Sequence, residues 1–564
     1  MHKLITFFLI FVAFATLSQT INPENLSKKE SLFWDFNKTQ LQATGSYFQD
    51  ELSITVEKHG KWLYYNRLGQ LEEERNYYRD KLNGKVVLYH PSKKLKQEGY
   101  FKFDQQDSIY REWNEMGKLT LEGTYQLDLQ VGEWKTFYAN GKEKSVEFYS
   151  QKQVEMRSFW LSDSLHTQTI VNGNGILKSY YTTGQLKEMY QYKNGLKNGP
   201  FEERSIYGYT TLTGFFLNGD KDSTWTYAYY TGKTEKISTY KNSVLNGPYF
   251  YYYDNDQLNV KGHYKNGLKD GAWSWYTNKG TPDMEGSFKE DLQDGDWKYW
   301  HPTGELSYEA KYKAGKKDGL WVYWYKNGEK FKEGSFKADE KEGQWTTWYE
   351  NGDLLMKGVY NAGKEEGEWF NYWENKILKN KITFKKGEMD GEWISNYPTG
   401  KLKLTGFYEK NLKVKTWVDF YENGKPKEVT NYKLVKIKSK VDYGFSKDRV
   451  LYESIKEGYA ASFSSKDYQL TETGSYKDGE KDGEWTAYYP GGRTPAVLSN
   501  YKNGKLNGAM KQYDRRGNLL QEMEFKNGVK DGRFVIYDKK GGVLKEKFFK
   551  EGNEDINGKT FSPR

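Results

Sequence analysis

The chain has no cysteine and very little histidine. Among its 564 residues there are 0 Cys and 6 His. The lack of cysteine excludes disulfides, thiolate metal ligands and a thiol nucleophile. Beyond the N-terminal segment, the histidines are dispersed over different parts of the sequence, at His59, His90, His166, His263 and His301. The sequence also has no Gly-rich phosphate loop that precedes a helical pattern. The sequence therefore predicts a protein that is not an enzyme and that holds no metal and no cofactor.

Long apolar runs and helical periodicity are also scarce. No window of 11 to 18 residues shows the apolar spacing of three and four that is typical of an amphipathic helix. The one long apolar run, residues 4–17, follows the basic start Met1-His2-Lys3 and ends at Ser18-Gln19. This pattern predicts a secretory signal peptide over residues 1–18, too short for a membrane-spanning helix. We expect an exported chain, in the periplasm, on the cell surface or secreted, with no lipoprotein cysteine and no later transmembrane segment.

Charge of one sign is not in large excess. The chain has 86 Lys and Arg against 77 Asp and Glu, a net charge of +9. Many lysines lie in Lys-Asn-Gly and Lys-Asp-Gly turns, where a solvated loop accounts for them. Nucleic acid is therefore not an expected partner.

What the sequence has in abundance is a 24-residue repeat. One position, which we call position zero, recurs at Gly175, Gly199 and Ser223 and every 24 residues on to Lys415 without an insertion. With the flanking copies there are nineteen repeats in all. Position two is Trp in eleven copies, position nine is usually a turn glycine, and position seventeen or eighteen is Tyr or Phe in every copy. A fixed period of 20 to 50 residues is typical of a stacked repeat architecture.

Each repeat reads as a β-hairpin followed by a polar loop. In Ala272–Gly295 an aromatic run, a Thr-Asn-Lys-Gly turn and a second run ending at Phe288 indicate strand, tight turn and strand. Because turn signals stand at both ends of every hairpin, consecutive hairpins should pair edge to edge. The predicted fold is all-β: an elongated, solenoid-like single antiparallel sheet of about 19–20 stacked β-hairpins.

Alternation along the strands predicts two distinct faces of this sheet. If the turn is symmetric about position eight, positions five, eleven and seventeen share one face, and positions two and four share the other; a bulge would undo this assignment. The Tyr and Phe of position seventeen are the predicted structural ladder, at Tyr264, Phe288, Tyr312, Phe336, Tyr360, Phe384 and Tyr408. The tryptophan face is either a second stacking ladder or a binding surface, with candidates Trp273, Trp275, Trp297, Trp321, Trp345, Trp369 and Trp393.

Two interruptions and two atypical ends divide the array. The predicted organisation is a signal peptide at 1–18, an N-terminal cap with a degenerate repeat at 19–59, repeats at 60–149, an irregular repeat at 150–174, continuous repeats at 175–432, an insertion loop at 433–458, repeats at 459–549 and a C-terminal cap at 550–564. In the irregular repeat, residues 154–161 and 166–171 could form a hairpin. The insertion is either a tolerated longer loop or part of a binding face.

The motif Tyr-Lys-Asn-Gly-x-x-Asp/Asn-Gly-x-Trp-x-x-Tyr-x-x-x-Gly, as in Tyr264–Gly280, resembles the MORN repeat. It is most similar to the bacterial MORN variant of proteins labelled YwqK-family antitoxins. The resemblance implies a stack of β-hairpins in an elongated sheet that acts as a scaffold, a membrane-apposed platform or a protein-binding ribbon. The antitoxin label implies that a partner toxin is neutralised by binding.

These observations together predict a non-enzymatic repeat scaffold, exported to the cell envelope, that binds another protein or macromolecule along its β surface. Two alternatives stay open. One is an antitoxin or immunity-like inhibitor of a partner toxin, and the other is a module that binds an envelope glycan through its aromatic face.

Overall fold

The computed structural model describes residues 29–49, 56–151, 153–437 and 451–556. The predicted signal peptide at 1–18 lies outside the described residues, as does the end of the C-terminal cap from residue 557. The described residues contain strands, turns and bends but no helix. The prediction of an all-β chain is confirmed.

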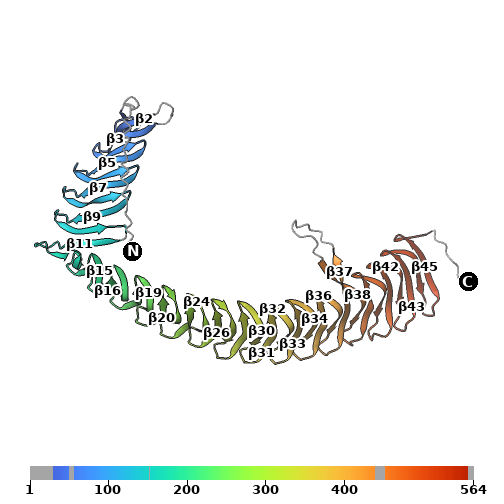
Figure 1. The fold of residues 1–564 in the computed structure, drawn as a ribbon. Helices are drawn as coiled ribbons and strands as arrows, with labels where there is room; N and C mark the ends of the chain where they lie inside the picture. Colours follow the sequence, from blue (N-terminus) through green and yellow to red (C-terminus); the bar gives the residue numbers. More distant parts are fainter. Residues whose placement is uncertain (1–28, 50–55, 152, 438–450, 557–564) are drawn as a thin grey trace, which may run out of the picture. The chain divides into compact units, whose positions relative to one another are not determined.

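The described chain forms 46 strands that belong to one open antiparallel sheet (Figure 1). The first nineteen are β1 (Glu30–Phe33), β2 (Leu41–Gln49), β3 (Val56–Tyr65), β4 (Leu71–Tyr78), β5 (Lys81–Tyr89), β6 (Leu95–Lys102), β7 (Gln105–Trp113), β8 (Leu119–Gln126), β9 (Leu129–Phe137), β10 (Glu143–Tyr149), β11 (Val154–Trp160), β12 (Gln168–Val171), β13 (Asn174–Tyr180), β14 (Leu186–Lys193), β15 (Leu196–Arg204), β16 (Thr210–Leu217), β17 (Asp220–Ala228), β18 (Thr234–Lys241) and β19 (Val244–Tyr252).

The remaining strands continue the same pattern. They are β20 (Leu258–Lys265), β21 (Leu268–Lys269), β22 (Gly271–Tyr276), β23 (Pro282–Lys289), β24 (Leu292–Gln293), β25 (Gly295–Trp300), β26 (Leu306–Lys313), β27 (Lys316–Lys317), β28 (Gly319–Trp324), β29 (Lys330–Lys337), β30 (Glu340–Trp348), β31 (Leu354–Asn361), β32 (Lys364–Tyr372), β33 (Leu378–Lys385), β34 (Glu388–Asn396), β35 (Leu402–Glu409), β36 (Leu412–Phe420), β37 (Pro426–Ile437), β38 (Leu451–Phe463), β39 (Leu470–Lys477), β40 (Glu480–Tyr488), β41 (Pro495–Lys502), β42 (Lys505–Tyr513), β43 (Leu519–Lys526), β44 (Val529–Tyr537), β45 (Val543–Lys550) and β46 (Asn553–Glu554).

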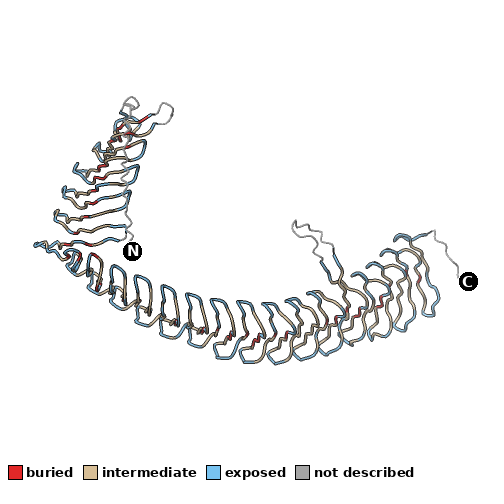
Figure 2. The backbone as a smooth tube through the Cα atoms, viewed as in Figure 1, coloured by how far each residue is buried: buried red, intermediate tan, exposed pale blue. Residues whose placement is uncertain are grey.

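The strands fall into two compact units, residues 1–256 with 264–267 and residues 257–263 with 268–564. Within each unit a strand pairs with the next one along the chain, as β30 does with β29 and β31. Buried residues lie in the middle of the strands, whereas the turns are exposed (Figure 2). The predicted meander of hairpins is therefore confirmed.

The hairpin of β30 and β31 shows how one repeat closes. Tyr349 N–H donates to the Asp353 carbonyl at 2.8 Å, and Gly352 N–H donates to the Tyr349 carbonyl at 2.9 Å. Gly352 has a φ of +83°, which glycine adopts without a steric cost, so the recurring glycine of position nine is explained. The Tyr349 hydroxyl donates to the Tyr372 carbonyl of the next hairpin at 2.8 Å, and this bond ties neighbouring repeats together at their turns.

A β-bulge beside this turn decides which side chains share a face. Thr347 pairs with Met356 but Trp348 pairs with Leu354, so one residue of β31 has no partner in β30. The bulge reverses the parity of the second strand relative to a symmetric turn. Position seventeen therefore lies on the same face as positions two and four, and position eleven lies with position five on the other. The face assignment made for a symmetric turn is wrong.

Position zero carries a second irregularity, between one hairpin and the next. The register between β29 and β30 shifts between Glu333 and Ser335, opposite the positive-φ residue Gly343 at φ +69°. Where this position is not glycine, Ser223 and Lys415 still adopt φ of 59° and 60°. The repeat thus imposes the left-handed conformation here even on residues that seldom take it.

Both interruptions of the array are hairpins. β11 and β12 pair through Phe159 with Ile170, so the hairpin expected in the irregular repeat is present. The predicted insertion loop at 433–458 is wrong for its described ends, because β37 and β38 remain paired out to Ile437 with Leu451. Apolar and β-branched residues such as Leu434, Val435 and Ile437 favour strand over loop. Position zero of the following repeat is Gly458, at φ +75°, one residue before the predicted Tyr459.

Candidate functional site: the two faces of the sheet

We call the face that carries positions two, four, thirteen, fifteen and seventeen the aromatic face, and the opposite one the charged face. Pairing in β30 and β31 shows the set directly: Gly343 lies opposite Tyr360, Trp345 opposite Gly358, and Thr347 opposite Met356. Every residue of this set points to the same side because side chains alternate along a strand.

The tryptophans of position two lie flat against glycines of the preceding strand. A Cβ on Gly334 would come within 2.1 Å of the Trp345 ring, so no side chain fits beneath it without moving the ring. The indole N–H of Trp345 donates to the Ser335 carbonyl at 3.1 Å. The same contact joins nine pairs, Gly45 and Trp62, Gly123 and Trp134, Gly214 and Trp225, Gly262 and Trp273, Gly286 and Trp297, Gly334 and Trp345, Gly358 and Trp369, Gly406 and Trp417, and Gly474 and Trp485.

Two repeats lack this glycine and show what it does. Ala310 precedes Trp321, which remains 4% exposed and keeps its indole bond to the Lys311 carbonyl at 3.2 Å. Ile382 precedes Trp393, which is only half-buried. The indole nitrogen of Trp393 has no partner among the described residues, but this also holds for Trp134 and Trp297, which lie on glycines, so the depth of burial is what distinguishes Trp393. The size of the residue at position fifteen therefore governs how deeply the tryptophan packs.

The aromatic side chains of position seventeen enclose each tryptophan edge-on. Trp345 lies between Phe336, with ring centroids 5.1 Å apart, and Tyr360, at 6.1 Å, both in T-shaped contact. Such pairs add about 0.5–1.5 kcal/mol each beyond the burial of their area. The predicted ladder residues Tyr264, Phe288, Tyr312, Phe336, Tyr360, Phe384 and Tyr408 are all half-buried.

This packing corrects the idea of an exposed tryptophan platform. Five of the seven candidates are at most 5% exposed, namely Trp273, Trp297, Trp321, Trp345 and Trp369. Trp275 and Trp393 are half-buried. The tryptophans form the stacking ladder: Trp273, Trp297, Trp345 and Trp369 each lie on a glycine of the preceding strand, and neighbouring rings cover their edges. What the aromatic face offers to a partner is instead its half-buried Tyr and Phe rings.

Lysines two residues before position zero add a cationic layer to this face. The Lys317 ammonium lies 4.7 Å from the Trp321 ring centroid, and Lys341 lies 5.0 Å from Trp345. Such cation–π contacts contribute about 0.5–1 kcal/mol when exposed. The arrangement recurs in seven repeats, with Lys58, Lys221, Lys269, Lys317, Lys341, Lys413 and Lys481 over the ring of their own repeat.

The densest aromatic cluster spans β22–β29. Its buried centre is Trp297, Ala310 and Trp321, and half-buried rings pack around it. Tyr299 and Tyr308 stack at 4.1 Å with their planes 14° apart, and Tyr308 stacks on Tyr323 at 5.4 Å. Burial, and then the neighbouring Tyr299 hydroxyl, raise the pKa of Tyr308 above its ordinary value. Tyr308 is therefore a neutral hydrogen-bonding group at physiological pH.

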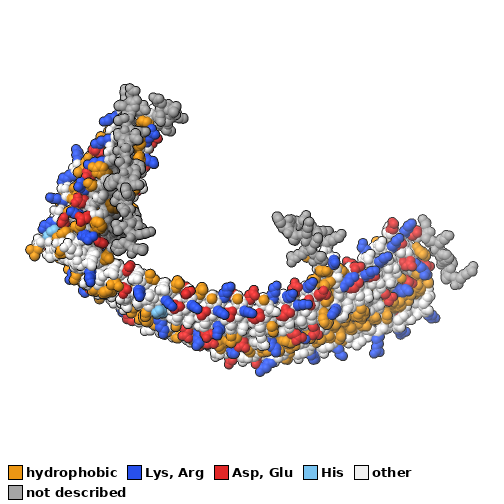
Figure 3. Space-filling view, in the orientation of Figure 1, with side chains coloured by type: hydrophobic (Ala, Val, Ile, Leu, Met, Phe, Trp, Pro, Cys, Tyr) orange, Lys and Arg blue, Asp and Glu red, His pale blue; other side chains and the backbone are white. Residues whose placement is uncertain are grey.

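On the charged face of the same strands, lysines form ion pairs with aspartates and glutamates. Lys311 and Asp296 approach to 3.4 Å, and Lys330 and Glu333 to 2.8 Å. In the first unit, Glu98 accepts from both Lys85 at 2.8 Å and Arg111 at 3.3 Å. Figure 3 shows basic, acidic and hydrophobic side chains interspersed over the surface in view. Exposed pairs of this kind contribute little stability, about 0–1 kcal/mol each.

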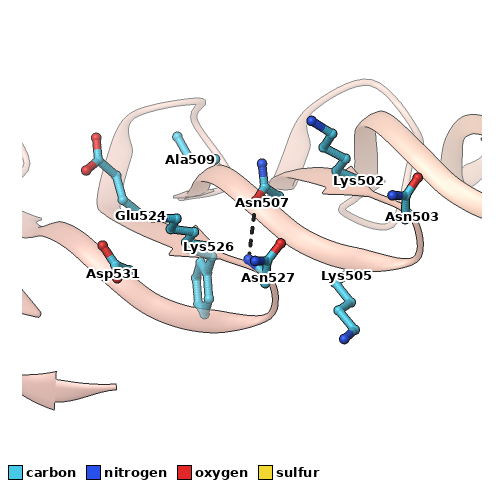
Figure 4. Close-up of a pocket in the computed structure, with 11 residues that line it drawn as sticks. Lys502, Asn503, Lys505, Asn507, Ala509, Glu524, Lys526, Asn527 and Asp531 are labelled. Carbon is cyan, nitrogen blue, oxygen red and sulfur yellow. Dashed lines mark hydrogen bonds between the residues drawn. The ribbon is translucent and has the colours of Figure 1, made fainter. Parts of the chain in front are cut away.

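A shallow hollow lies near the loops of β41–β44 and has a volume of about 980 Å³ (Figure 4). Its lining includes Lys502, Asn507, Glu524 and Asn527. The Asn527 N–H donates to the Asn507 side-chain oxygen at 3.2 Å, and Glu524 accepts from the Arg533 N–H at 3.1 Å. A hollow with matching lining positions recurs at Asn174–Phe215. Because these polar groups already bond to the backbone of adjacent repeats, the hollow is explained by the repeat geometry.

The side chains that could ligate a metal ion are not clustered in the described part of the chain. No group of three or more His, Asp or Glu side chains is placed to hold a metal ion there. His301 and His59 belong to different units, and His90 and His166 each contact a backbone carbonyl, of Trp113 at 2.8 Å and Glu143 at 2.5 Å. No helix of the described residues is long and apolar enough to cross a membrane.

Two features of the aromatic face were not predicted from the sequence. One is the glycine at position fifteen, and the other is the lysine two residues before position zero. Both recur at fixed spacing from the tryptophan, so the repeat pattern itself carries the signal. The contact with the ring could not be anticipated, since it depends on the bulges.

Twelve segments of the chain match the family model described as MORN repeat variant. They are residues 58–77, 82–103, 130–151, 174–194, 245–266, 293–314, 317–338, 341–362, 365–386, 389–410, 413–434 and 506–527. The matched segments are MORN repeat variants. Each matched segment covers most of one MORN unit, including the tryptophan and the aromatic of position seventeen wherever these are present. No curated protein matches the chain.

A comparison with solved structures also gave matches. A crystal structure of TcdB2-TccC3 with Cdc42 is 12% identical, with a TM-score of 0.14, and the match covers 92% of this chain but 31% of that one. The Photorhabdus luminescens Tc holotoxin pore is 8% identical, with a TM-score of 0.10, over 90% of this chain and 30% of that one. The MORN chain thus spans under a third of the length of these proteins. Scores this low carry no argument about function.

Proposed function

We propose that this MORN repeat protein is a non-enzymatic scaffold, exported to the cell envelope, that binds a partner protein along the aromatic face of its sheet. One observation carries the proposal: the described residues form a single sheet with no second layer. The half-buried Tyr and Phe rings of the aromatic face are thus left uncovered by the described part of the chain.

The composition and rigidity of this face support binding to a protein. Tyrosine and tryptophan are enriched at the energetic centres of protein interfaces, where they supply a large contact area at a small entropic cost. The stack of Tyr299, Tyr308 and Tyr323 is held in place by the buried Trp297 and Trp321 beneath it. Rings that are already ordered lose little conformational freedom on binding.

Site-specific crosslinking tests the proposal in the organism that makes the protein. A photoreactive amino acid replaces Tyr323 on the aromatic face or Lys298 on the charged face, and the crosslinked products are recovered from each cell fraction. We expect one protein to be captured through position 323 from the envelope fraction and not through position 298. Equal capture by both faces would contradict the choice of face, and recovery of the chain with residues 1–18 intact from the cytosol would contradict export.

The two alternative functions give different outcomes in the same experiment. An antitoxin-like role requires that the captured protein be toxic when the MORN chain is deleted. Glycan binding requires exposed ring faces, and the burial of Trp297, Trp321 and Trp345 leaves few of them. We therefore favour a protein partner over a glycan, and protection of the rings by cell-wall polysaccharide would reverse that preference.

A further inference from the structure

Three lysines on the aromatic face have no acidic partner. Lys317, Lys332 and Lys341 belong to the successive strands β27, β29 and β30. Among the described residues, only the Lys341 side chain makes a hydrogen bond, to the Tyr360 hydroxyl at 3.2 Å, and none of the three ammonium groups lies within ion-pair distance of a carboxylate. We call these three residues the lysine patch.

Aromatic rings hold the three ammonium groups close together. The Lys332 ammonium lies 5.3 Å from the ring centroids of both Tyr323 and Trp345. Lys341 also contacts Trp345, at 5.0 Å, and Lys317 lies 5.0 Å from Phe336, which itself packs on Trp345. All three charges therefore gather around two touching rings.

The positive charges of the lysine patch repel one another. Burial lowers the pKa of Lys332, and the positive charges of Lys341 and Lys317 lower it further. Between Lys269 and Tyr360, every aromatic-face position is aromatic, apolar, a glycine, a neutral polar residue or a lysine, and none is acidic. A bound anion would relieve this repulsion, and partial burial would strengthen its attraction.

The opposite face of the same strands shows the contrast. There Lys311 and Asp296 approach to 3.4 Å, Lys330 and Glu333 to 2.8 Å, and Lys298 and Glu285 to 3.8 Å. These three lysines of the charged face thus have carboxylate partners, whereas the ammonium groups of the lysine patch have none within ion-pair distance in the described part of the chain. The missing negative charge must come from solvent ions or from a ligand.

The patch is also short. The residues equivalent to Lys317 and Lys341 in the adjacent repeats are Gln293 on one side and Glu365 on the other. Three strand lines about 4.8 Å apart span about 10 Å, close to the length of three extended residues. A long polyanion or a flat anionic membrane would meet Glu365 next to the patch, so a short acidic segment of a polypeptide fits it better.

We propose that the lysine patch binds an acidic peptide segment of the partner protein, with two or three carboxylates on the three lysines and its apolar side chains on the rings of Tyr323, Phe336 and Trp345. This inference rests on the proposed function and names the chemistry of the partner. Acidic side chains two or three residues apart in an extended peptide are separated by about 7–10 Å, which fits within the span of about 10 Å of the three strand lines.

Peptide titration with matched variants tests the inference. The probe is a fluorescent peptide of alternating glutamate and leucine, titrated into the full chain and into two triple variants. Lys317→Gln with Lys332→Gln and Lys341→Gln removes the patch, whereas Lys298→Gln with Lys311→Gln and Lys330→Gln removes the same charge from the charged face of neighbouring strands. We expect about 10- to 100-fold weaker binding for the first variant and less than twofold change for the second.

Three results would overturn the inference: equal loss in both triple variants, no loss in either, or equally tight, lysine-dependent binding of phosphatidylserine vesicles or a DNA oligonucleotide. Unchanged circular dichroism and melting of both variants exclude misfolding as the cause. A second readout is the Lys332 side-chain resonance, whose pKa should rise when the peptide binds. If crosslinking at position 323 captures the same partner from the patch variant undiminished, the inference fails while the scaffold function stands.

Discussion

The glycine beneath each tryptophan gives the sharpest test of how this sheet is stabilised without a second layer. Replacing Gly334 by Ile should convert the environment of Trp345 into that of Trp393, which follows Ile382. A Cβ at position 334 would lie 2.1 Å from the ring, so the ring must move outward. We expect Trp345 to change from 3% exposed to half-buried and to lose its bond to the Ser335 carbonyl.

The cost follows from the area and the bond that are lost. A tryptophan buries about 150–250 Å², and re-exposing on the order of 50 Å² costs about 1.3 kcal/mol at 25 cal/mol per Å². The lost indole bond costs about 1 kcal/mol more. Isoleucine is a better strand residue than glycine and returns up to about 1 kcal/mol. The net destabilisation should be about 1–2 kcal/mol.

The assay is fluorine NMR of 5-fluorotryptophan, assigned with Trp345→Phe and Trp393→Phe, together with urea unfolding. The reverse variant, Ile382→Gly, should protect Trp393 from solvent. Ser335→Ile places the same bulk one residue away on the charged face and should leave Trp345 protected, while Gly334→Ala should resemble the natural pair of Ala310 and Trp321. If Trp345 stays protected in Gly334→Ile, the glycine is not the reason for its burial.

Four further predictions concern the other contacts. Tyr349→Phe should cost about 1 kcal/mol in urea unfolding by removing the bond to the Tyr372 carbonyl, whereas Tyr207→Phe, at a 75% exposed position, should cost nothing; equal effects would deny the turn bond a role. Phe336→Ala should cost about 2–3 kcal/mol, below the 3–5 kcal/mol of a fully buried ring, because Phe336 is half-buried, and an unchanged melting curve would refute this. Deleting residues 320–343 joins Gly319 to Gln344 in phase and should leave a folded, shorter array by circular dichroism; insoluble product would count against modularity. Burial and the neighbouring Glu188 raise the pKa of Tyr190 to about 12, above the unfolded value of about 10, so its contribution to stability is complete below pH 10 and is lost as the pH rises towards 12. Melting temperatures of wild type and Tyr190→Phe should therefore diverge only above pH 10.

The fold could be predicted from the sequence because the repeat period, the turn glycines and the strand residues all indicate the same hairpin. The face of each residue could not. Parity depends on the bulges at Trp348 and Gly343, and a bulge moves a whole strand's side chains to the other face. The insertion was predicted as a loop because it lies outside the repeat period, whereas residues 433–437 and 451–455 extend the hairpin of β37 and β38 by pairing with each other.

The candidate site was harder to predict because conspicuous residues are not necessarily accessible ones. Tryptophan at position two is the most visible residue of the repeat, yet its regularity reflects packing on glycine. Burial of the ring in a sheet with no second layer needs a small residue on the preceding strand, glycine in nine repeats and Ala310 beneath Trp321, and this contact is made across the bulge. The side chains that a partner could contact lie instead at position thirteen and at position twenty-two, which is the position two residues before the next position zero. These two positions vary more between repeats.

Variation between repeats is therefore where a partner could be recognised. Positions two, fifteen and seventeen must stay nearly constant because they build the ladder, whereas positions thirteen and twenty-two cover the ladder and can change without breaking it. Position twenty-two is lysine at Lys317 and Lys341 but glutamine at Gln293 and glutamate at Glu365. The repeats thus present aromatic rings at a regular spacing, but the charge over the rings changes between some neighbouring repeats. A partner that reads this sequence of charges would bind in one register along the array, which a uniform set of repeats could not specify.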